Sequence, residues 1–139
     1  MTTDYPQNLL KNRRPDRITT LDEYRHNGGY TAIEEVVAKS SPAHEVQKKV
    51  VDAILLGRGG AGFPAGQKMI TVAEDAPHPR YVVCNADEME PGTFKDRVLL
   101  HAEPHMLIEG MVLAAYAIGA SHGIIFIRPE YETAAQILE

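Results

Sequence analysis

The sequence predicts an α/β fold, and three consecutive segments support this prediction. Arg80–Cys84 is a short, nearly continuous apolar run of the kind found in buried parallel strands. Pro104 begins an apolar segment with helical spacing that continues to about Ile118, and a second strand-like run covers Gly123–Arg128. A strand, a helix and a strand in this order form one crossover unit of a parallel sheet, which should be right-handed.

Residues 1–19 are predicted to form an extended N-terminal arm. This part of the chain contains Pro6, Pro15 and the basic run Lys11–Arg14, and it shows no clear periodicity. Two interpretations remain open, because such an arm could be solvated or could lie on a partner subunit.

Residues 20–56 are predicted to form a helical segment. Thr20 with Glu23 and Thr31 with Glu34 match the capping box, in which a hydroxyl and a carboxylate satisfy each other's free amides. Between them, Asn27–Gly29 interrupts the helical pattern.

A further helix is expected after Ser41 and Pro42, which suit an N-cap and a first-turn proline. Its apolar positions recur at helical spacing. They are Val46, Val50, Ile54 and Leu55.

Five glycines lie between Gly57 and Gly66. The spacing of Gly57, Gly59 and Gly62 matches the dinucleotide-binding pattern, but that turn requires a preceding strand and a following helix. Here a predicted helix precedes the glycines and Phe63 with a proline follows them. The loop could therefore bind a nucleotide or serve only as a structural turn.

Polar residues follow the first predicted strand, where open α/β sheets bind their ligands. The segment Asn85–Glu90 occupies this position. Taken singly, Asp87, Glu88 and Glu90 are equally well explained as solvated turn carboxylates.

Three other polar or reactive features have simple structural explanations. Lys95–Arg97 is expected to form local ion pairs and caps, and His105 to cap a helix or lie in the core. Cys84 lies within an apolar run, so we expect a small buried hydrophobic residue there.

Composition excludes several classes of protein. The chain has 139 residues, of which 44% are hydrophobic and 24% charged, as in soluble globular proteins. Its net charge of −5 gives no reason to expect nucleic-acid binding. It shows no secretory signal and no apolar run near the roughly 18 residues of a membrane span. With one cysteine the chain forms no internal disulfide, and we expect a cytoplasmic location.

The last predicted helix begins at Glu130 and the sequence ends within it, at Glu139. Two strands cannot supply a stable parallel sheet that is covered on both faces. We therefore expect either another chain to complete this one or, preferably, a longer protein of which this is the front part.

Three segments together resemble a known family. They read GRGGAGFPAGQK from Gly57, CNADEMEPGTFKDR from Cys84 and PHMLIEGMVLAAYAIGA from Pro104. The combination resembles the flavin-binding subunit of respiratory NADH:quinone oxidoreductase (complex I). It is similar also to the diaphorase subunits of NAD-reducing hydrogenases and formate dehydrogenases. The likeness covers about Leu21 to Ile137 and implies that residues 57–139 form the first, incomplete part of a Rossmann-like domain with parallel strands that binds FMN and NADH.

The resemblance implies a function as well. In this family, hydride passes directly from NADH to FMN without a catalytic side chain, and single electrons then leave through iron–sulfur clusters. The chain is accordingly expected to be part of an NADH dehydrogenase flavoprotein subunit. Its expected partners are NADH and other subunits, including iron–sulfur subunits. Any contact with the inner membrane would be indirect, through the peripheral arm of such a complex.

Site residues are carried over by position in the matching segments. The residues expected to bind FMN are Gly57, Arg58, Gly59, Gly60, Lys68, Asn85 and Asp87. The residues expected to bind NADH are Gly62, Phe63, Gly66, Lys68, Glu88 and Glu90.

Each expected role has a chemical reason. Glycines let backbone amides approach phosphate oxygens or the flat flavin ring, and Lys68 can neutralise phosphate or stabilise negative charge on the reduced flavin. Asn85 and Asp87 can hydrogen-bond the ribityl hydroxyls or the ring edge, and Phe63 can stack on the dinucleotide. A carboxylate at Glu88 or Glu90 can accept a hydrogen bond from a ribose hydroxyl and would repel a 2′-phosphate, which favours NADH over NADPH.

The sequence departs from the family pattern in several places, which limits how many of the family's functional features can be assigned to this chain. A 4Fe-4S cluster held by thiolates needs four cysteines, so it is expected only in the missing C-terminal part or in partner subunits. The family's later flavin and NAD motifs lie beyond Glu139, Met69–Thr71 replaces aromatic residues, and Pro129 replaces a glycine. The alternative is a non-catalytic nucleotide-binding or assembly module derived from this subunit.

Overall fold

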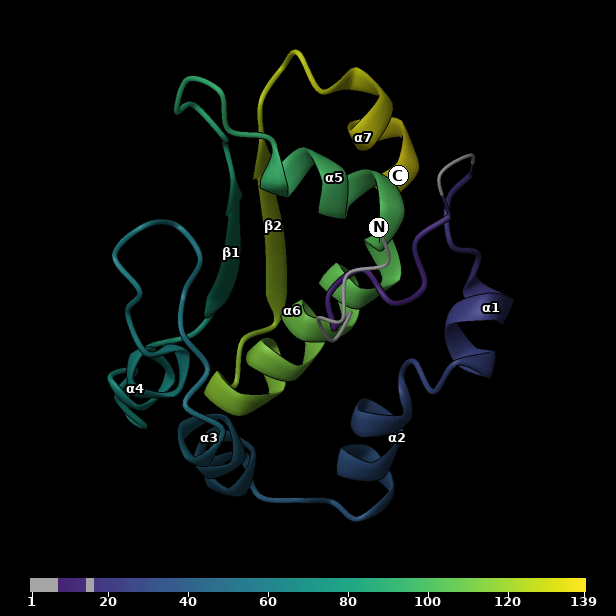
Figure 1. Cartoon of the computed structure of the whole chain (residues 1–139). Helices are drawn as coiled ribbons and strands as arrows, with labels where there is room; N and C mark the ends of the chain where they lie inside the picture. Colours follow the sequence, from purple (N-terminus) through teal and green to yellow (C-terminus); the bar gives the residue numbers. More distant parts are fainter. Residues whose placement is uncertain (1–7, 15–16) are drawn as a thin grey trace. The chain divides into compact units, whose positions relative to one another are not determined.

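A computed structural model describes residues 8–14 and 17–139 (Figure 1). Pro6 and Pro15 of the predicted arm lie outside the described residues. The elements in chain order are α1 (Leu21–His26), α2 (Thr31–Ala38), α3 (Ala43–Asp52), α4 (Ala65–Ile70), β1 (Tyr81–Ala86), α5 (Lys95–Ala102), α6 (Pro104–Ile118), β2 (His122–Ile127) and α7 (Glu132–Leu138).

The chain divides into two compact units. The first unit contains the described residues up to Tyr30, together with Asn85–Glu109 and Ile125–Glu139. The second unit contains Thr31–Cys84 and Gly110–Ile124. The predicted division of the sequence into 1–19, 20–56 and 57–139 remains a prediction.

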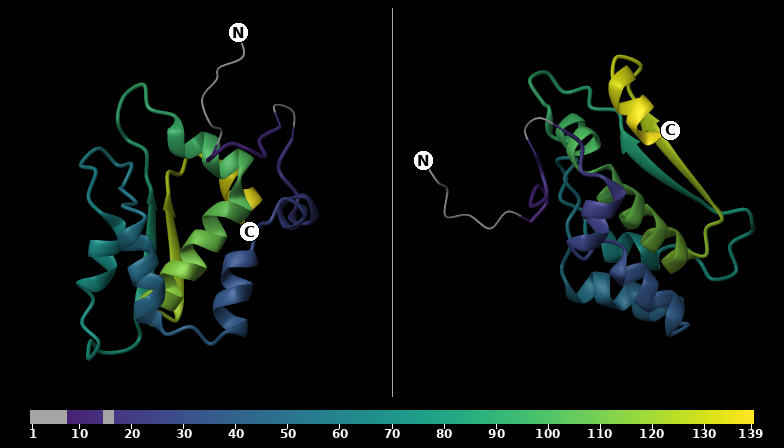
Figure 2. Two further views of the ribbon diagram at one scale, coloured as in Figure 1. Left: turned by 60° about the horizontal axis from the view of Figure 1, so that its bottom comes forward. Right: turned by 90° about the vertical axis from the view of Figure 1, so that its right-hand side faces the viewer.

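The two parallel strands confirm the predicted α/β class. β1 and β2 are neighbours in a two-stranded sheet, as Figures 1 and 2 show. The expectation of strands buried on both faces is wrong for this chain. Tyr81 and Val83, at alternate positions of β1, are exposed, and so are Ile124 and Phe126 at alternate positions of β2. No second layer within the described residues covers these side chains.

Helix α6 confirms the predicted Pro104–Ile118 helix. It ends in a Schellman arrangement, with Gly119 N–H bonded to Tyr116 O (3.3 Å) and Ala120 N–H to Ala115 O (2.8 Å). Gly119 has a φ of 65° and is therefore the predicted C′ residue. The helix is mostly half-buried rather than buried all round, and Val112 is exposed.

Helices α2, α3 and the second half of α6 form the core of the second unit. Val36, Val46 and Ala117 are buried at its centre. The Tyr116 hydroxyl donates to the Ser41 carbonyl (2.6 Å), which ties the connection between α2 and α3 to α6.

Several predicted helix ends are displaced. α3 begins one residue later than expected, because Pro42 rather than Ser41 is its N-cap. α2 begins at Thr31 itself, whereas the predicted capping box would place Thr31 just before the helix. α3 also stops at Asp52, and Ile54, predicted on its buried face, has a φ of 51° and is 74% exposed.

Two buried residues attach the described part of the N-terminal arm to the first unit, although most of its described residues are exposed, as expected of a solvated arm. Asn12 and Thr19 are buried. The Asn12 backbone N–H donates to the Glu103 carboxylate (3.1 Å), and the Thr19 hydroxyl donates to the Asn12 carbonyl (3.3 Å). Glu103 follows α5 directly and is only 1% exposed, so this acid anchors the arm to the body of the unit.

A second buried acid, Glu109 of α6, organises the segment around α1. It accepts hydrogen bonds from the Tyr24 hydroxyl (2.5 Å) and from the Tyr30 N–H (2.9 Å). Burial, together with this carboxylate, raises the pKa of Tyr24, so the phenol stays protonated and can donate. His105, predicted to cap a helix or lie in the core, is half-buried; it stacks on Tyr24 and contacts the Tyr30 hydroxyl. The capping box at Thr20 is also confirmed.

None of the helices in the described part is by itself long and apolar enough to cross a membrane. Among the described helices, α5 and α6 taken together reach the required length and composition, and the two are bent by 98° at their junction.

The anchoring of the arm predicts a stability effect at Glu103. Glu103→Ala should lower the free energy of unfolding by about 2 kcal/mol, because it leaves the buried N–H of Asn12 without an acceptor. Urea denaturation followed by circular dichroism measures the change. Glu130→Ala, which removes an exposed acid from the same unit, is the control. Equal effects of the two substitutions would contradict the anchoring role.

Candidate functional site

The glycine-rich segment forms the tip of a short hairpin in the second unit. Leu56 and Pro64 form an antiparallel bridge. Gly57 N–H donates to Phe63 O (2.8 Å), and Ala65 N–H donates to Leu55 O (2.8 Å). The hairpin joins α3 to α4, so the predicted preceding helix is present, and the chain here differs from a Rossmann first turn.

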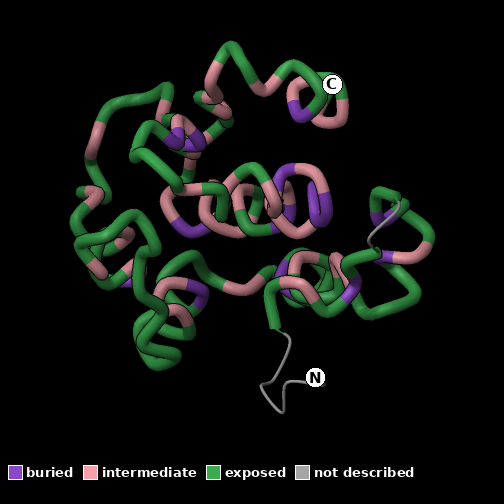
Figure 3. Tube along the Cα trace, turned by 45° about the horizontal axis from the view of Figure 1, so that its top comes forward, coloured by how far each residue is buried: buried purple, intermediate pink, exposed green. Residues whose placement is uncertain are grey.

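The tip of the hairpin presents bare backbone to the surroundings. Residues 57–61 are exposed. Figure 3 shows that most of the other loops are exposed as well. Gly60 and Gly62 have φ values of 111° and 63°, which favour glycine. Within the described residues, no backbone N–H from Arg58 to Gly62 donates a hydrogen bond. These free donors in an open turn are the feature that a phosphate or a flavin edge can use.

Gly66 differs from the other glycines of this segment, because it is buried where α4 packs on α3. A Cβ atom at this position would lie 2.6 Å from both the backbone nitrogen and Cγ2 of Val51. At Gly59, by contrast, a Cβ atom would meet nothing within 4 Å. The structure therefore gives Gly66 a packing reason that is independent of any ligand.

Two further predicted ligands lie near this hairpin in the sequence and in the same unit. Phe63, which lies directly after the tip of the hairpin, is 53% exposed. Lys68 is exposed on α4, a helix that the sequence did not predict. Met69, which replaces a family aromatic residue, packs against the core cluster of the second unit.

The segment Asn85–Glu90 lies in the first unit, at the end of β1. The Asn85 side chain accepts a hydrogen bond from the Asp87 N–H (3.1 Å), which forms an Asx turn. Asp87 is half-buried, Glu88 is buried and Glu90 is exposed. The three acids, which the sequence could not distinguish, therefore have three different environments.

Glu88 is fully engaged with protein groups. Its carboxylate accepts from the backbone N–H of Asp96 (3.0 Å) and Arg97 (3.3 Å), in the first turn of α5, and from the Tyr131 hydroxyl (3.2 Å). Arg128 donates to the Glu88 carbonyl (2.8 Å). Burial alone would raise the pKa of Glu88, but the hydrogen bonds from α5 and Tyr131 outweigh it and lower the pKa.

Arg128 and Tyr131 are therefore supporting residues that sequence reasoning did not include in the site. The Arg128 guanidinium lies 5.9 Å from the centre of the Tyr131 ring, and Arg97 lies 5.7 Å from it. The one sequence feature that could have indicated a role for Arg128 is its position at the end of the second predicted strand. Lys95 pairs with Asp96, as predicted for that segment.

The predicted site residues thus form two groups. The hairpin, Phe63 and Lys68 belong to the second unit, and Asn85–Glu90 belongs to the first. In the part of the chain that the structure describes, no three His, Cys, Asp or Glu side chains gather to form a metal site. Cys84 is half-buried.

Comparison with known proteins identifies the family. The family model described as the Nuo51 FMN-binding domain (Complex1_51K) matches residues 50–139. The chain belongs to this family. The matched part of the FMN-binding domain includes the glycine hairpin and the Asn85–Glu90 segment.

Curated relatives of this FMN-binding family are longer than the chain. The F subunit of the NADH-quinone oxidoreductase of Aquifex aeolicus is 47% identical over 130 residues, which cover 94% of this chain and 30% of the relative. The corresponding protein of Escherichia coli is 49% identical over 116 residues, which cover 83% of this chain and 26% of the relative. The chain therefore spans less than a third of the length of these relatives.

A solved structure supports the same relationship. In the air-oxidized NAD+-reducing [NiFe]-hydrogenase, the matching region is 50% identical and superposes with a TM-score of 0.65. It covers 70% of this chain and 18% of the hydrogenase chain.

The two kinds of glycine predict different effects on folding. Gly66→Ala should lower the free energy of unfolding by about 2–3 kcal/mol, because the added methyl group overlaps the Val51 backbone. Gly59→Ala, in the same segment, should change it by less than about 0.5 kcal/mol. Urea titration of both variants without ligand measures the two free energies of unfolding. Similar losses in the two variants would show that the close approach of Gly66 to the Val51 backbone does not affect stability.

The lowered pKa of Glu88 predicts a dependence of stability on pH. The carboxylate stabilises the fold above the ordinary glutamate pKa of about 4.3, and this contribution disappears as the pH falls through the lower pKa of the folded state. Glu88→Gln should therefore cost about 2 kcal/mol at neutral pH and progressively less in acid.

Unfolding measured at pH 7 and at about pH 3 tests this dependence. Glu90→Gln is the matched control, because Glu90 is exposed in the same loop. If the loss of free energy of unfolding in Glu88→Gln did not change with pH, the ionised carboxylate of Glu88 would not be what stabilises the start of α5.

Proposed function

We propose that this chain supplies part of the FMN- and NADH-binding site of the NADH-oxidising flavoprotein subunit of a multisubunit dehydrogenase. The main support is that one family-matched stretch holds both the open glycine hairpin and the Asn85–Glu90 loop. Membership of the FMN-binding family makes a flavin the first ligand to consider.

The residues fit FMN. Free amides between Arg58 and Gly62 suit phosphate oxygens or the ring edge, and exposed Lys68 supplies a mobile positive charge. The Asx turn holds Asn85 and Asp87 where strand β1 ends, so their polar atoms can bind hydroxyls. A flavin held by these residues would supply redox chemistry, because FMN can take up the two electrons of one hydride and release them singly.

We assign NADH recognition to Phe63 and to an acid of the second loop. Phe63 exposes a ring on which a base or a nicotinamide can stack. Among the acids, Glu90 is free of the hydrogen bonds that occupy Glu88, so Glu90 is the better acceptor for a ribose hydroxyl. Glu88 remains in the site as the residue that positions the loop.

We propose that the other contacts to FMN and NADH come from residues that correspond to the part of the longer relatives not matched by this chain. The named relatives are subunits of NADH-quinone oxidoreductase, and the solved relative belongs to an NAD+-reducing hydrogenase. We infer that the chain works within such a complex, in its peripheral part, and passes electrons to iron–sulfur centres held elsewhere.

A substitution at Glu90 tests the proposal in the complete, FMN-loaded protein. Glu90→Gln should raise the KM for NADH about tenfold, or roughly 1.4 kcal/mol of lost binding, and reduce the preference for NADH over NADPH. FMN content should stay unchanged. Steady-state NADH:ferricyanide assays and flavin absorbance provide the two measurements.

Glu132→Gln, an exposed acid of the same unit, is the control. An unchanged KM and nucleotide preference in Glu90→Gln would remove the role assigned to that acid. A complete protein that holds no FMN would overturn the proposed function and support a module without redox activity.

A further inference from the structure

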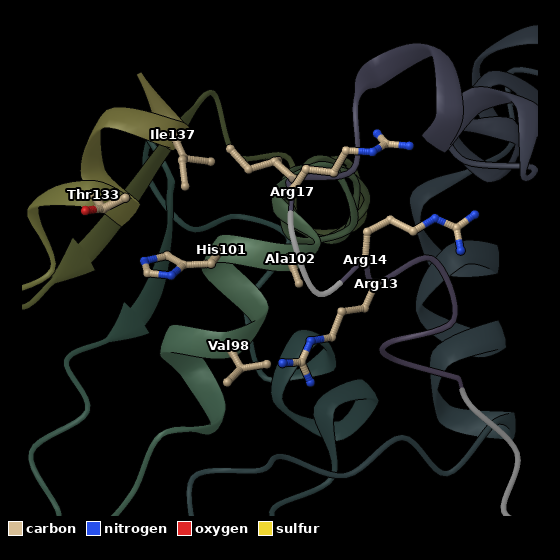
Figure 4. A pocket seen from close by; sticks show the side chains of 9 residues that line it. Arg13, Arg14, Arg17, Val98, His101, Ala102, Thr133 and Ile137 are labelled. Carbon is tan, nitrogen blue, oxygen red and sulfur yellow. The ribbon is translucent and has the colours of Figure 1, made fainter. Parts of the chain in front are cut away.

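The first unit contains a cavity of about 330 Å³ that the proposed function does not use. The N-terminal arm, α5 and α7 line this cavity, which Figure 4 shows from close by. Its volume lies at the lower end of the range for ligand pockets. We call it the arm pocket.

The arm pocket combines an apolar lining with positive charge. Ile18, Val98 and Ile137 are among its apolar residues. Arg13, Arg14 and Arg17 of the arm also line it. Among the residues that the structure describes, no acidic one lines the pocket, although the whole chain carries a net charge of −5. A ligand that suits it therefore has both apolar and negatively charged groups.

His101 is a second feature that favours a ligand with a hydrogen-bond acceptor. It lines the arm pocket from α5, and its Nε2 atom is buried without a hydrogen-bond partner among the described residues. A buried polar atom without a partner costs free energy, and a rotation of the His101 ring that brings this nitrogen to the pocket surface would let it donate to a ligand carboxylate.

The arginines do not converge on one point. In Figure 4 the Arg13 guanidinium lies toward Val98, whereas the guanidinium groups of Arg14 and Arg17 point away from His101. Arg17 also pairs with Glu23 (2.6 Å). A small anion such as phosphate would need several donors aimed at one position. Charges spread around an apolar lining instead suit an extended chain with several carboxylates.

The position of the arm is set by contacts outside the pocket. Asn12 and Thr19, on either side of the arginines in the sequence, are buried and linked by the contacts to Glu103 and to each other. The part of the arm that carries Arg13 is therefore pre-organised, which reduces the entropy lost on binding.

We propose that the arm pocket docks an acidic peptide segment of another subunit, with an apolar anchor side chain against Val98 and Ile137. A carboxylate beside the anchor pairs with Arg13, and another reaches His101, while one farther along the peptide pairs with Arg14. This interface is independent of flavin and NADH, so it can be tested separately from the proposed function.

Fluorescence anisotropy with a short labelled peptide tests the proposal. The probe has a Leu-Phe pair flanked by glutamates and aspartates, and the comparison peptide has serines in place of Leu-Phe. The double variant Arg13→Glu/Arg14→Glu should weaken binding of the probe at least about tenfold. Lys48→Glu/Lys49→Glu, with the same change of net charge on exposed lysines of the second unit, should weaken it less than about twofold.

Two further variants test the pocket without changing its charge. Val98→Ser should weaken the Leu-Phe probe about tenfold, and His101→Ala should weaken it severalfold. Circular dichroism confirms that each variant is folded, and inorganic phosphate added as a competitor should not displace the probe at millimolar concentration.

Several results would overturn the proposal. Equal losses in the arginine and lysine double variants would show that only net charge attracts the probe. Equal affinity for the serine peptide would exclude an apolar anchor, and displacement by phosphate would instead identify a small-anion site.

Discussion

The first unit depends on the buried carboxylate of Glu88. A carboxylate that is removed from water must find hydrogen bonds within the protein, and this one finds them at the start of α5 and at the Tyr131 hydroxyl. Arg128 binds the carbonyl of the same residue. One residue thus joins the end of β1 to α5, to the residue after β2 and to the residue before α7. The loop that carries Glu90 leaves from this junction, so its first residues are fixed while its acid stays exposed.

The second unit depends on close contact between α3 and α4. Gly66 permits this contact because any larger residue would meet the Val51 backbone. The contact brings the two ends of the glycine segment together, and the bridge between Leu56 and Pro64 closes the hairpin. The exposed tip then offers backbone amides together with the side chain of Arg58. Glycines in one short segment therefore have two physical roles, namely helix packing and an open backbone.

Sequence patterns predicted well the elements that have a continuous apolar run or a capping signal, and poorly those that have neither. The helix after Pro104 and both strands were predicted to within two residues at each end, because each is a nearly continuous apolar run. Helices α4 and α5 were missed, since neither begins with the capping-box pattern that indicated the equally short α1 and α2. The end of α3 was misplaced because Ile54 continues the apolar spacing, although a positive φ there has already ended the helix.

The sequence by itself determined the fold class, the family and the two segments that carry the candidate site, since these follow from local patterns and specific motifs. It could not separate Glu88 from Glu90, which belong to one motif and have the same chemistry. Only the tertiary structure decided that Glu88 is buried beneath α5 and that Glu90 is exposed. The same holds for the arm, where Asn12 is buried against Glu103 although the basic residues beside it stay exposed. Burial and long-range hydrogen bonds join residues that are far apart in the chain, and no local pattern records them.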